Sequence, residues 1–211
     1  EHTLLTCWLR RYAAVKFLLY NLLGGLIMLA AVIGLYVQSV NAGQPSFLLA
    51  DLVALDVPVD LQRWLFLGFM FAFAIKAPLW PFHTWLPDAA AESTPANAAY
   101  LSGVMDKVGT FGMIALVLPL FPDATREFAP VVVVLAVISI IYGALLAVGQ
   151  TDMKRLIAYT SISHFGFIVL GIFALTSQGV AGSTLYMVNH GLSTVALFVI
   201  VGFLIVRRGS R

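Results

Sequence analysis

Long apolar stretches alternate with short polar connections along almost the whole chain. A helix that crosses a bilayer needs about 20 consecutive, mostly apolar residues, and six stretches of the sequence meet this requirement. The pattern predicts an all-α fold, a polytopic membrane bundle of six transmembrane helices that form a single transmembrane domain. The expected spans cover residues 17–37, 64–82, 96–121, 129–149, 156–175 and 183–206.

Composition supports this prediction and excludes other classes of protein. Of the 211 residues, 61% are apolar and 10% are charged, whereas about 25% of the residues of a soluble domain are charged. So high an apolar content also excludes disorder, which requires low hydrophobicity. The net charge of +2 is too small to indicate nucleic-acid binding. Cys7 is the single cysteine, so an internal disulfide and a four-cysteine metal or iron–sulfur site are excluded.

The two ends of the sequence are those expected of a piece of a longer polytopic protein. The chain begins at Glu1 without an initiator methionine, and the stretch Arg207–Arg211 is polar, like a connecting loop.

Basic residues are distributed unequally between the two faces that six spans create. Arg63 and Arg126 fall on the face away from the chain ends. Because an excess of lysine and arginine marks the cytoplasmic face, we expect the residue 1 side and the residue 211 side to be cytoplasmic. Eight basic residues fall on that face: Arg10, Arg11, Lys16, Lys154, Arg155, Arg207, Arg208 and Arg211.

Two lysines lie deep inside predicted spans. At a rise of 1.5 Å per residue, Lys76 is about 18 Å from Trp64, and Lys107 is about 16 Å from Ala96. A charge at mid-membrane costs at least about 2.5 kcal/mol and usually marks an ion or proton path. The alternative is a lysine that pairs with a carboxylate purely for packing. A lysine pair with switchable carboxylate partners can store a proton, because low dielectric disfavours the ammonium and a nearby carboxylate restores it.

Two prolines follow the first of these lysines closely. Pro78 has no N–H group, so the carbonyl of Ala74 loses its helical partner, and Pro81 repeats the disruption within one turn. The sequence therefore predicts a discontinuous helix at Lys76–Pro78. Broken helices at membrane depth line the ion sites of many transporters, although a simple proline kink is the alternative.

Two histidines add polar groups to the last two predicted spans. His164 lies about 12 Å into the fifth span, and His190 lies about 10 Å into the sixth. Hydrogen bonding between helices is one interpretation, but an imidazole also accepts and donates protons near neutral pH. Together the four residues favour a proton relay through Lys76, Lys107, His164 and His190. Asp106 points about 100° away from its neighbour Lys107 around the helix, so we expect it to face another span or a cavity.

Motifs of redox and nucleotide chemistry are absent from the sequence. It contains no GxGxxG after a strand, no P-loop and no CxxC. We therefore expect no redox centre, cofactor or metal in this chain. Such a chain transports a substance, or it scaffolds subunits that do.

Two motifs, Phe73–Ala89 and Leu101–Gly112, resemble the antiporter-like subunits of bacterial NADH-quinone oxidoreductase, respiratory complex I. Asn189–Ser193 fits the same family, while Leu118–Pro122 and Gln150–Phe167 point to one particular subunit of it. The resemblance extends over nearly the whole chain. It implies a longer fold of two inverted helix repeats in a bacterial inner (plasma) membrane.

The resemblance also implies a function. In that family Lys76 would be the broken-helix lysine, Lys107 the central lysine, and His164 and His190 the membrane histidines of a proton-translocating subunit. NADH, FMN, iron–sulfur clusters and quinone would be bound by other subunits, and the partners would be neighbouring antiporter-like subunits, the lipid bilayer, protons and water, with no nucleic acid. A glutamate that pairs with the broken-helix lysine and a charged residue on a second broken helix have no counterpart in this sequence. Asp106 departs from the family pattern, where an apolar residue precedes the central lysine.

Three other functions are compatible with these residues. A subunit of a multi-subunit cation/proton antiporter or of a membrane-bound hydrogenase shares these helices and differs in its neighbouring subunits. A passive scaffold predicts that Lys76→Ala and Lys107→Ala damage only assembly. A quinone-processing subunit requires a quinone to bind among these helices, and no motif demands one.

Overall fold

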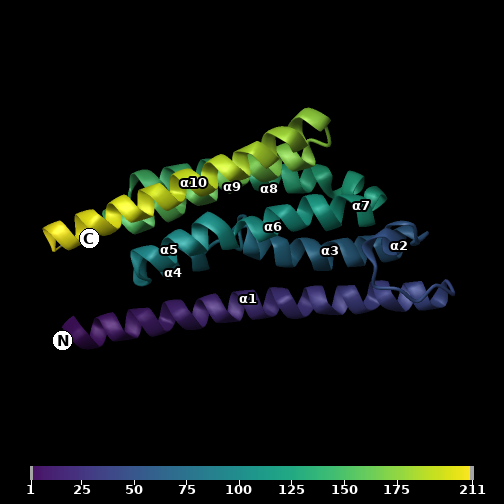
Figure 1. Ribbon diagram of the computed structural model, residues 1–211, viewed down its shortest axis with the longest axis horizontal. Helices are drawn as coiled ribbons and strands as arrows, with labels where there is room; N and C mark the ends of the chain where they lie inside the picture. Colours follow the sequence, from purple (N-terminus) through teal and green to yellow (C-terminus); the bar gives the residue numbers. More distant parts are fainter. Residues whose placement is uncertain (1, 210–211) are drawn as a thin grey trace.

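The computed structural model describes the backbone of residues 2–209 and the side chains of residues 7–209. Within this range the chain forms helices and no strands, which confirms the predicted all-α class. The long helices lie alongside one another, and both ends of the chain are at the same end of the bundle (Figure 1). Arg211, which the sequence places on that face, lies outside the described residues.

The first part of the chain forms a long helical hairpin. Helix α1 (His2–Asn41) leads through the short helix α2 (Leu49–Val53) to helix α3 (Val59–Lys76). The two long helices pack closely where Gly68 faces α1, since a Cβ atom on this glycine would lie 2.8 Å from the Cβ atom of Ala31.

The predicted discontinuous helix is confirmed. Helix α3 ends at Lys76, and helix α4 (Trp85–Glu92) begins only after an irregular segment. Helix α5 (Pro95–Tyr100) starts with Thr94 as its N-cap, whose side chain accepts a hydrogen bond from the backbone N–H of Asn97. Pro95 occupies the first turn, where its missing N–H costs nothing.

The third predicted span is less regular than its apolar pattern indicates. After α5 the chain continues through a π-helical segment η1 (Leu101–Met105), helix α6 (Lys107–Gly112), a second π segment η2 (Met113–Val117) and helix α7 (Leu118–Leu120). In a π segment the hydrogen bonds join residues i and i+5 instead of i and i+4. Each π segment therefore rotates the side chains that follow it around the helix axis. The hydrophobic pattern gave no sign of these segments.

The last three helices form the rest of the bundle. Helix α8 (Pro122–Val148) packs along helix α9 (Met153–Phe173), and helix α10 (Ser177–Arg208) covers α9 from another side. The contact of α8 with α9 is close because a Cβ atom on Gly166 would lie only 2.7 Å from the carbonyl oxygen of Ala136. Helix α9 is the most enclosed of the three, since 61% of its most apolar 18-residue stretch is buried.

Five helical stretches among the described residues are long and apolar enough to cross a membrane. They are Cys7–Asn41, Pro95–Leu120, Pro122–Val148, Met153–Phe173 and Ser177–Arg208. Helix α3 is 18 residues long and contains Asp60, Arg63 and Lys76, and it is not among the five. An integral multi-pass protein is thereby supported, whereas the count of six spans stays a prediction.

Charged side chains gather at the two ends of the bundle. At one end Asp88 of α4 joins α1 to α9, because its carboxylate lies 2.8 Å from Lys16 and 2.8 Å from Arg155. At the other end Arg63 pairs with Glu127 at 2.8 Å. The structure therefore separates Lys16 and Arg155 from Arg63, as the charge pattern predicts.

Candidate functional site

Two backbone carbonyls at the broken end of α3 find hydrogen-bond partners beyond the break. The carbonyl of Ala74, which loses its helical partner to Pro78, instead accepts a hydrogen bond from the N–H of Leu79 at 2.9 Å. The carbonyl of Ile75 accepts one from the indole Nε1–H of Trp85 at 3.0 Å. Because Trp85 is completely buried, this bond fixes the start of α4 against the end of α3.

Lys76 lies at this break and reaches toward α1. Its ammonium donates a hydrogen bond to the side-chain oxygen of Asn21 at 3.1 Å, and the lysine is half-buried. Asn21 is the strongly polar residue in the otherwise apolar middle of α1. Within this chain the amide oxygen of Asn21 thus solvates the Lys76 ammonium inside the bundle.

Lys107 begins α6, directly after the first π segment, and its ammonium donates a hydrogen bond to the carbonyl of Ser102. The same nitrogen lies 5.0 Å from the ring centroid of Phe165 on α9. A cation at this distance from an aromatic face is stabilised by the ring quadrupole. Lys107 is therefore held between its own helix and α9.

The two membrane histidines are neighbours across α9 and α10. Their ring centroids are 5.2 Å apart, and Nδ1 of His164 lies 2.7 Å from the hydroxyl of Tyr186. His190 is 4% exposed, and neither ring nitrogen has a hydrogen-bond partner among the described residues. Both histidines also interact electrostatically with Lys107.

The four predicted residues, called the row below, lie on four helices that pack in sequence, α3 on α6, α6 on α10 and α10 on α9. Lys76 of α3 lies at one end, Lys107 follows on α6, and His164 and His190 form the other end on α9 and α10. Such a row of exchangeable N–H groups inside apolar helices suits the movement of a proton.

Sequence reasoning missed the side chains that bind these residues. Tyr186 precedes His190 by four residues and so lies on the same face of α10, a signal that was available. Asn21 interrupts an otherwise apolar span, but the sequence alone does not indicate which residue it contacts. Both bonds join residues far apart in the chain, 22 positions for His164–Tyr186 and 55 for Lys76–Asn21.

Other charged residues near the break have structural roles. Asp152 is the N-cap of α9 and accepts hydrogen bonds from the backbone N–H groups of Lys154 and Arg155. The ammonium of Lys154 donates to the carbonyls of Ala91 and Ser93, at the end of α4. These contacts stabilise helix ends.

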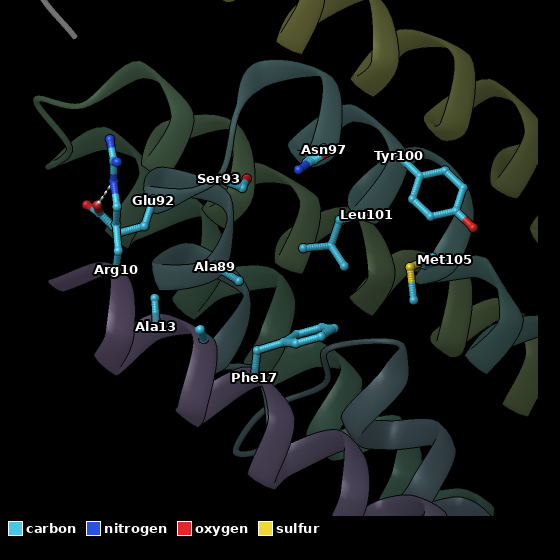
Figure 2. A pocket seen from close by; sticks show the side chains of 11 residues that line it. Arg10, Ala13, Phe17, Ala89, Glu92, Ser93, Asn97, Tyr100, Leu101 and Met105 are labelled. Carbon is cyan, nitrogen blue, oxygen red and sulfur yellow. Dashed lines mark ion pairs between the residues drawn. The ribbon is translucent and has the colours of Figure 1, made fainter. Parts of the chain in front are cut away.

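A pocket of about 320 Å³ lies between α1 and the segment from α4 to η1 (Figure 2). Arg10 and Glu92 approach within 4.0 Å on its rim, and apolar side chains such as Phe17 and Met105 line the rest. None of the four relay residues lines it, so the pocket and the row are separate features. Among the described residues no cluster of three or more histidine, cysteine, aspartate or glutamate side chains could hold a metal.

Comparison with known proteins identifies the family of the chain. A family profile described as "NADH:quinone oxidoreductase/Mrp antiporter, TM" matches residues 4–211. The chain belongs to this family. The resemblance drawn from the motifs is therefore confirmed.

The relatives within this family include NADH-quinone oxidoreductase subunit M of Mycobacterium tuberculosis, which is 64% identical over 208 residues. Subunit M of Pseudomonas aeruginosa is 43% identical over 203 residues. Each comparison covers 96% of this chain but only 38% and 40% of the relative. The chain thus spans about two-fifths of the length of the curated relatives it matches.

Solved structures of the family have the same fold. A chain of respiratory complex I from Thermus thermophilus matches 95% of this chain with a TM-score of 0.88 and 38% identity, and 42% of that chain is covered. A chain of the Mrp complex from Dietzia sp. matches 95% with a TM-score of 0.84 and 27% identity, and 36% of it is covered. The helices described above are therefore those of an antiporter-like subunit.

Proposed function

We propose that this chain is part of a membrane subunit that translocates protons in an NADH-quinone oxidoreductase. The row of Lys76, Lys107, His164 and His190 inside the bundle is the observation that carries the proposal. The identity of 64% to a subunit M supports the same assignment. Electron transfer takes place in other subunits, which bind NADH, FMN, iron–sulfur clusters and quinone, and this chain carries no redox centre of its own.

In this mechanism a charge change in a neighbouring subunit alters the environment of Lys76 at the broken helix. Lys107 then changes its affinity for a proton, because α6, which begins at Lys107, packs directly on the end of α3 that carries Lys76. His164 and His190 exchange that proton in turn, and the hydroxyl of Tyr186, 2.7 Å from His164, holds the imidazole in place. Water chains connect the row to the two faces of the membrane.

The proposal also defines partners and location. The neighbouring antiporter-like subunits of the complex contact this one, and the bilayer surrounds it in the bacterial inner membrane. The excess of basic residues on the face of the chain ends supports a cytoplasmic position for that face.

A second candidate is a subunit of a cation/proton antiporter. The TM-score of 0.84 to a chain of the Mrp complex supports it, because the same helices serve both assemblies. The identity of 27% to that chain, against 64% to a subunit M, favours the oxidoreductase. Purification of the full-length protein with its neighbours distinguishes the two, since only one assembly oxidises NADH.

Replacement of Lys107 by alanine tests the proposed function. The complete complex that carries Lys107→Ala is reconstituted in liposomes, and NADH oxidation and proton uptake are recorded together. We expect electron transfer to be retained and the protons pumped per NADH to fall, because the row loses its central exchangeable group.

Lys154→Ala is the matched control, because it removes another buried lysine, one that binds the carbonyls at the end of α4. It is expected to lower the stability of the complex while the assembled fraction pumps normally. Unchanged proton stoichiometry with Lys107→Ala would refute the proposal and favour a passive scaffold.

A further inference from the structure

Asp106 is a carboxylate that the row described above does not use. It is fully buried at 0% exposure, and neither carboxylate oxygen has a hydrogen-bond partner among the described residues. A buried charge without hydrogen bonds is costly unless other charges offset it. Two charged groups interact electrostatically with Asp106, namely Lys107, the next residue, and Lys76 of α3.

The backbone places Asp106 at the junction of the π segment η1 and α6. Its N–H donates to the carbonyl of Leu101 at 3.1 Å, the i to i+5 bond of a π turn. Adjacent helical residues point about 100° apart. Lys107 contacts Phe165 of α9, so the neighbouring carboxylate is directed to a different side of the helix.

Close packing of α6 on α3 brings the carboxylate near the broken helix. A Cβ atom on Gly109 would lie 2.6 Å from the backbone nitrogen of Ala77, the residue directly after Lys76. The helix that begins directly after Asp106 therefore touches the end of α3 at the position of the lysine. Asp106 interacts with lysines on both sides of this contact.

The charged groups around the carboxylate are those of the row. Lys76 of α3 and Lys107 of α6 interact electrostatically with the carboxylate, and His164 and His190 of α9 and α10 interact with Lys107. Two ammonium groups repel each other, and neither can accept a proton from the other while both are charged. A carboxylate between them offsets the repulsion and offers an acceptor.

We propose that Asp106 is the proton-carrying carboxylate that links Lys76 to Lys107, an inference that rests on the proposed function. In the transfer a water molecule takes a proton from the Lys107 ammonium, whose N–H bond breaks, and gives a proton to Asp106, on which an O–H bond forms. This leaves a neutral amine, a neutral acid and the water unchanged. The acid then gives its proton, again through water, to the neutral amine of Lys76 and becomes a carboxylate again. The reverse sequence moves a proton the other way.

The test uses the complete NADH-oxidising complex with the full-length protein, reconstituted in liposomes. Asp106→Asn keeps the shape of the side chain and removes the exchangeable proton, whereas Asp106→Glu keeps the carboxyl. We expect Asp106→Asn to slow proton transfer through this subunit by at least about 100-fold, the range of a lost proton-transfer group. The protons pumped per NADH then fall to the value of Lys107→Ala, and Asp106→Glu retains most of the pumping.

An infrared difference spectrum recorded during NADH turnover adds a readout that a purely structural role does not change. A band of a protonated carboxyl group is expected in the unmodified complex and in Asp106→Glu, and it is absent in Asp106→Asn. Should Asp106→Asn fail to assemble, Asp106→Leu removes the carboxyl without burying an unpaired polar group, and the same decrease in pumping is expected.

The outcomes separate this inference from the proposed function. Normal pumping with Asp106→Asn, while Lys107→Ala abolishes it, overturns the role of Asp106 and leaves the proposed function in place. Normal pumping with Lys107→Ala overturns the proposed function itself. Failure of both Asp106→Asn and Asp106→Leu to assemble, when Lys107→Ala assembles, assigns Asp106 to folding and overturns the inference.

Discussion

Gly109 of α6 packs directly against the broken end of α3. A Cβ atom there would lie 2.6 Å from the backbone nitrogen of Ala77 and 2.8 Å from the carbonyl oxygen of Phe73. Both are backbone atoms, which cannot rotate away as the end of a side chain does. The substitution Gly109→Ala therefore forces α6, which begins at Lys107, away from the end of α3, which carries Lys76.

The size of the effect follows from these distances. Ordinary van der Waals contact begins at 3.4 Å, so the helices must separate by about 0.8 Å, the difference between 3.4 and 2.6 Å. Overpacking of this kind costs about 1–3 kcal/mol, which exceeds the gain of roughly 0.5–1 kcal/mol from replacing a helical glycine by alanine. A displacement near 1 Å in a site that requires alignment lowers its rate by about 100-fold.

Thermal unfolding and proton pumping of the reconstituted complex measure the two effects. Gly25→Ala is the matched control, because no described atom lies within 4 Å of the added Cβ atom. We expect a lower unfolding temperature and strongly reduced pumping for Gly109→Ala, and neither for Gly25→Ala. Equal stability and equal pumping of the two variants would show that α6 and α3 are not packed as described.

Two further substitutions test the scaffold of the site. Trp85→Phe removes the indole N–H that binds the carbonyl of Ile75 at 3.0 Å. Because an unsatisfied buried acceptor costs about 1–3 kcal/mol, we expect the thermal unfolding midpoint to fall. An unchanged midpoint contradicts a stabilising role of this hydrogen bond. Asp88→Asn breaks the ion pairs to Lys16 and Arg155. Because solvent screens this partly exposed cluster, we expect the free energy of unfolding to fall by less than about 3 kcal/mol, with normal pumping per NADH in the assembled complex. A pumping defect in that complex would place Asp88 on the proton route.

The sequence alone was sufficient for the features that depend on neighbouring residues. The apolar stretches indicated a helical membrane protein, because a bilayer requires long helices whose backbone groups bond internally. The break after Lys76 followed from Pro78, which lacks an N–H group. Each of these rules acts within a few positions of the chain, so no partner from elsewhere is needed to apply it.

The tertiary structure alone decided which side chains meet. Asn21 binds Lys76, and Tyr186 binds His164, because the packing and rotation of whole helices bring distant positions together. The π turn before Asp106 changes that rotation, and a hydrophobic pattern that is apolar on every side does not reveal it. The sequence thus determined which ionisable groups lie within the predicted spans, and the packing of α6 against α3 and α10 determined which of the helices that carry them lie side by side.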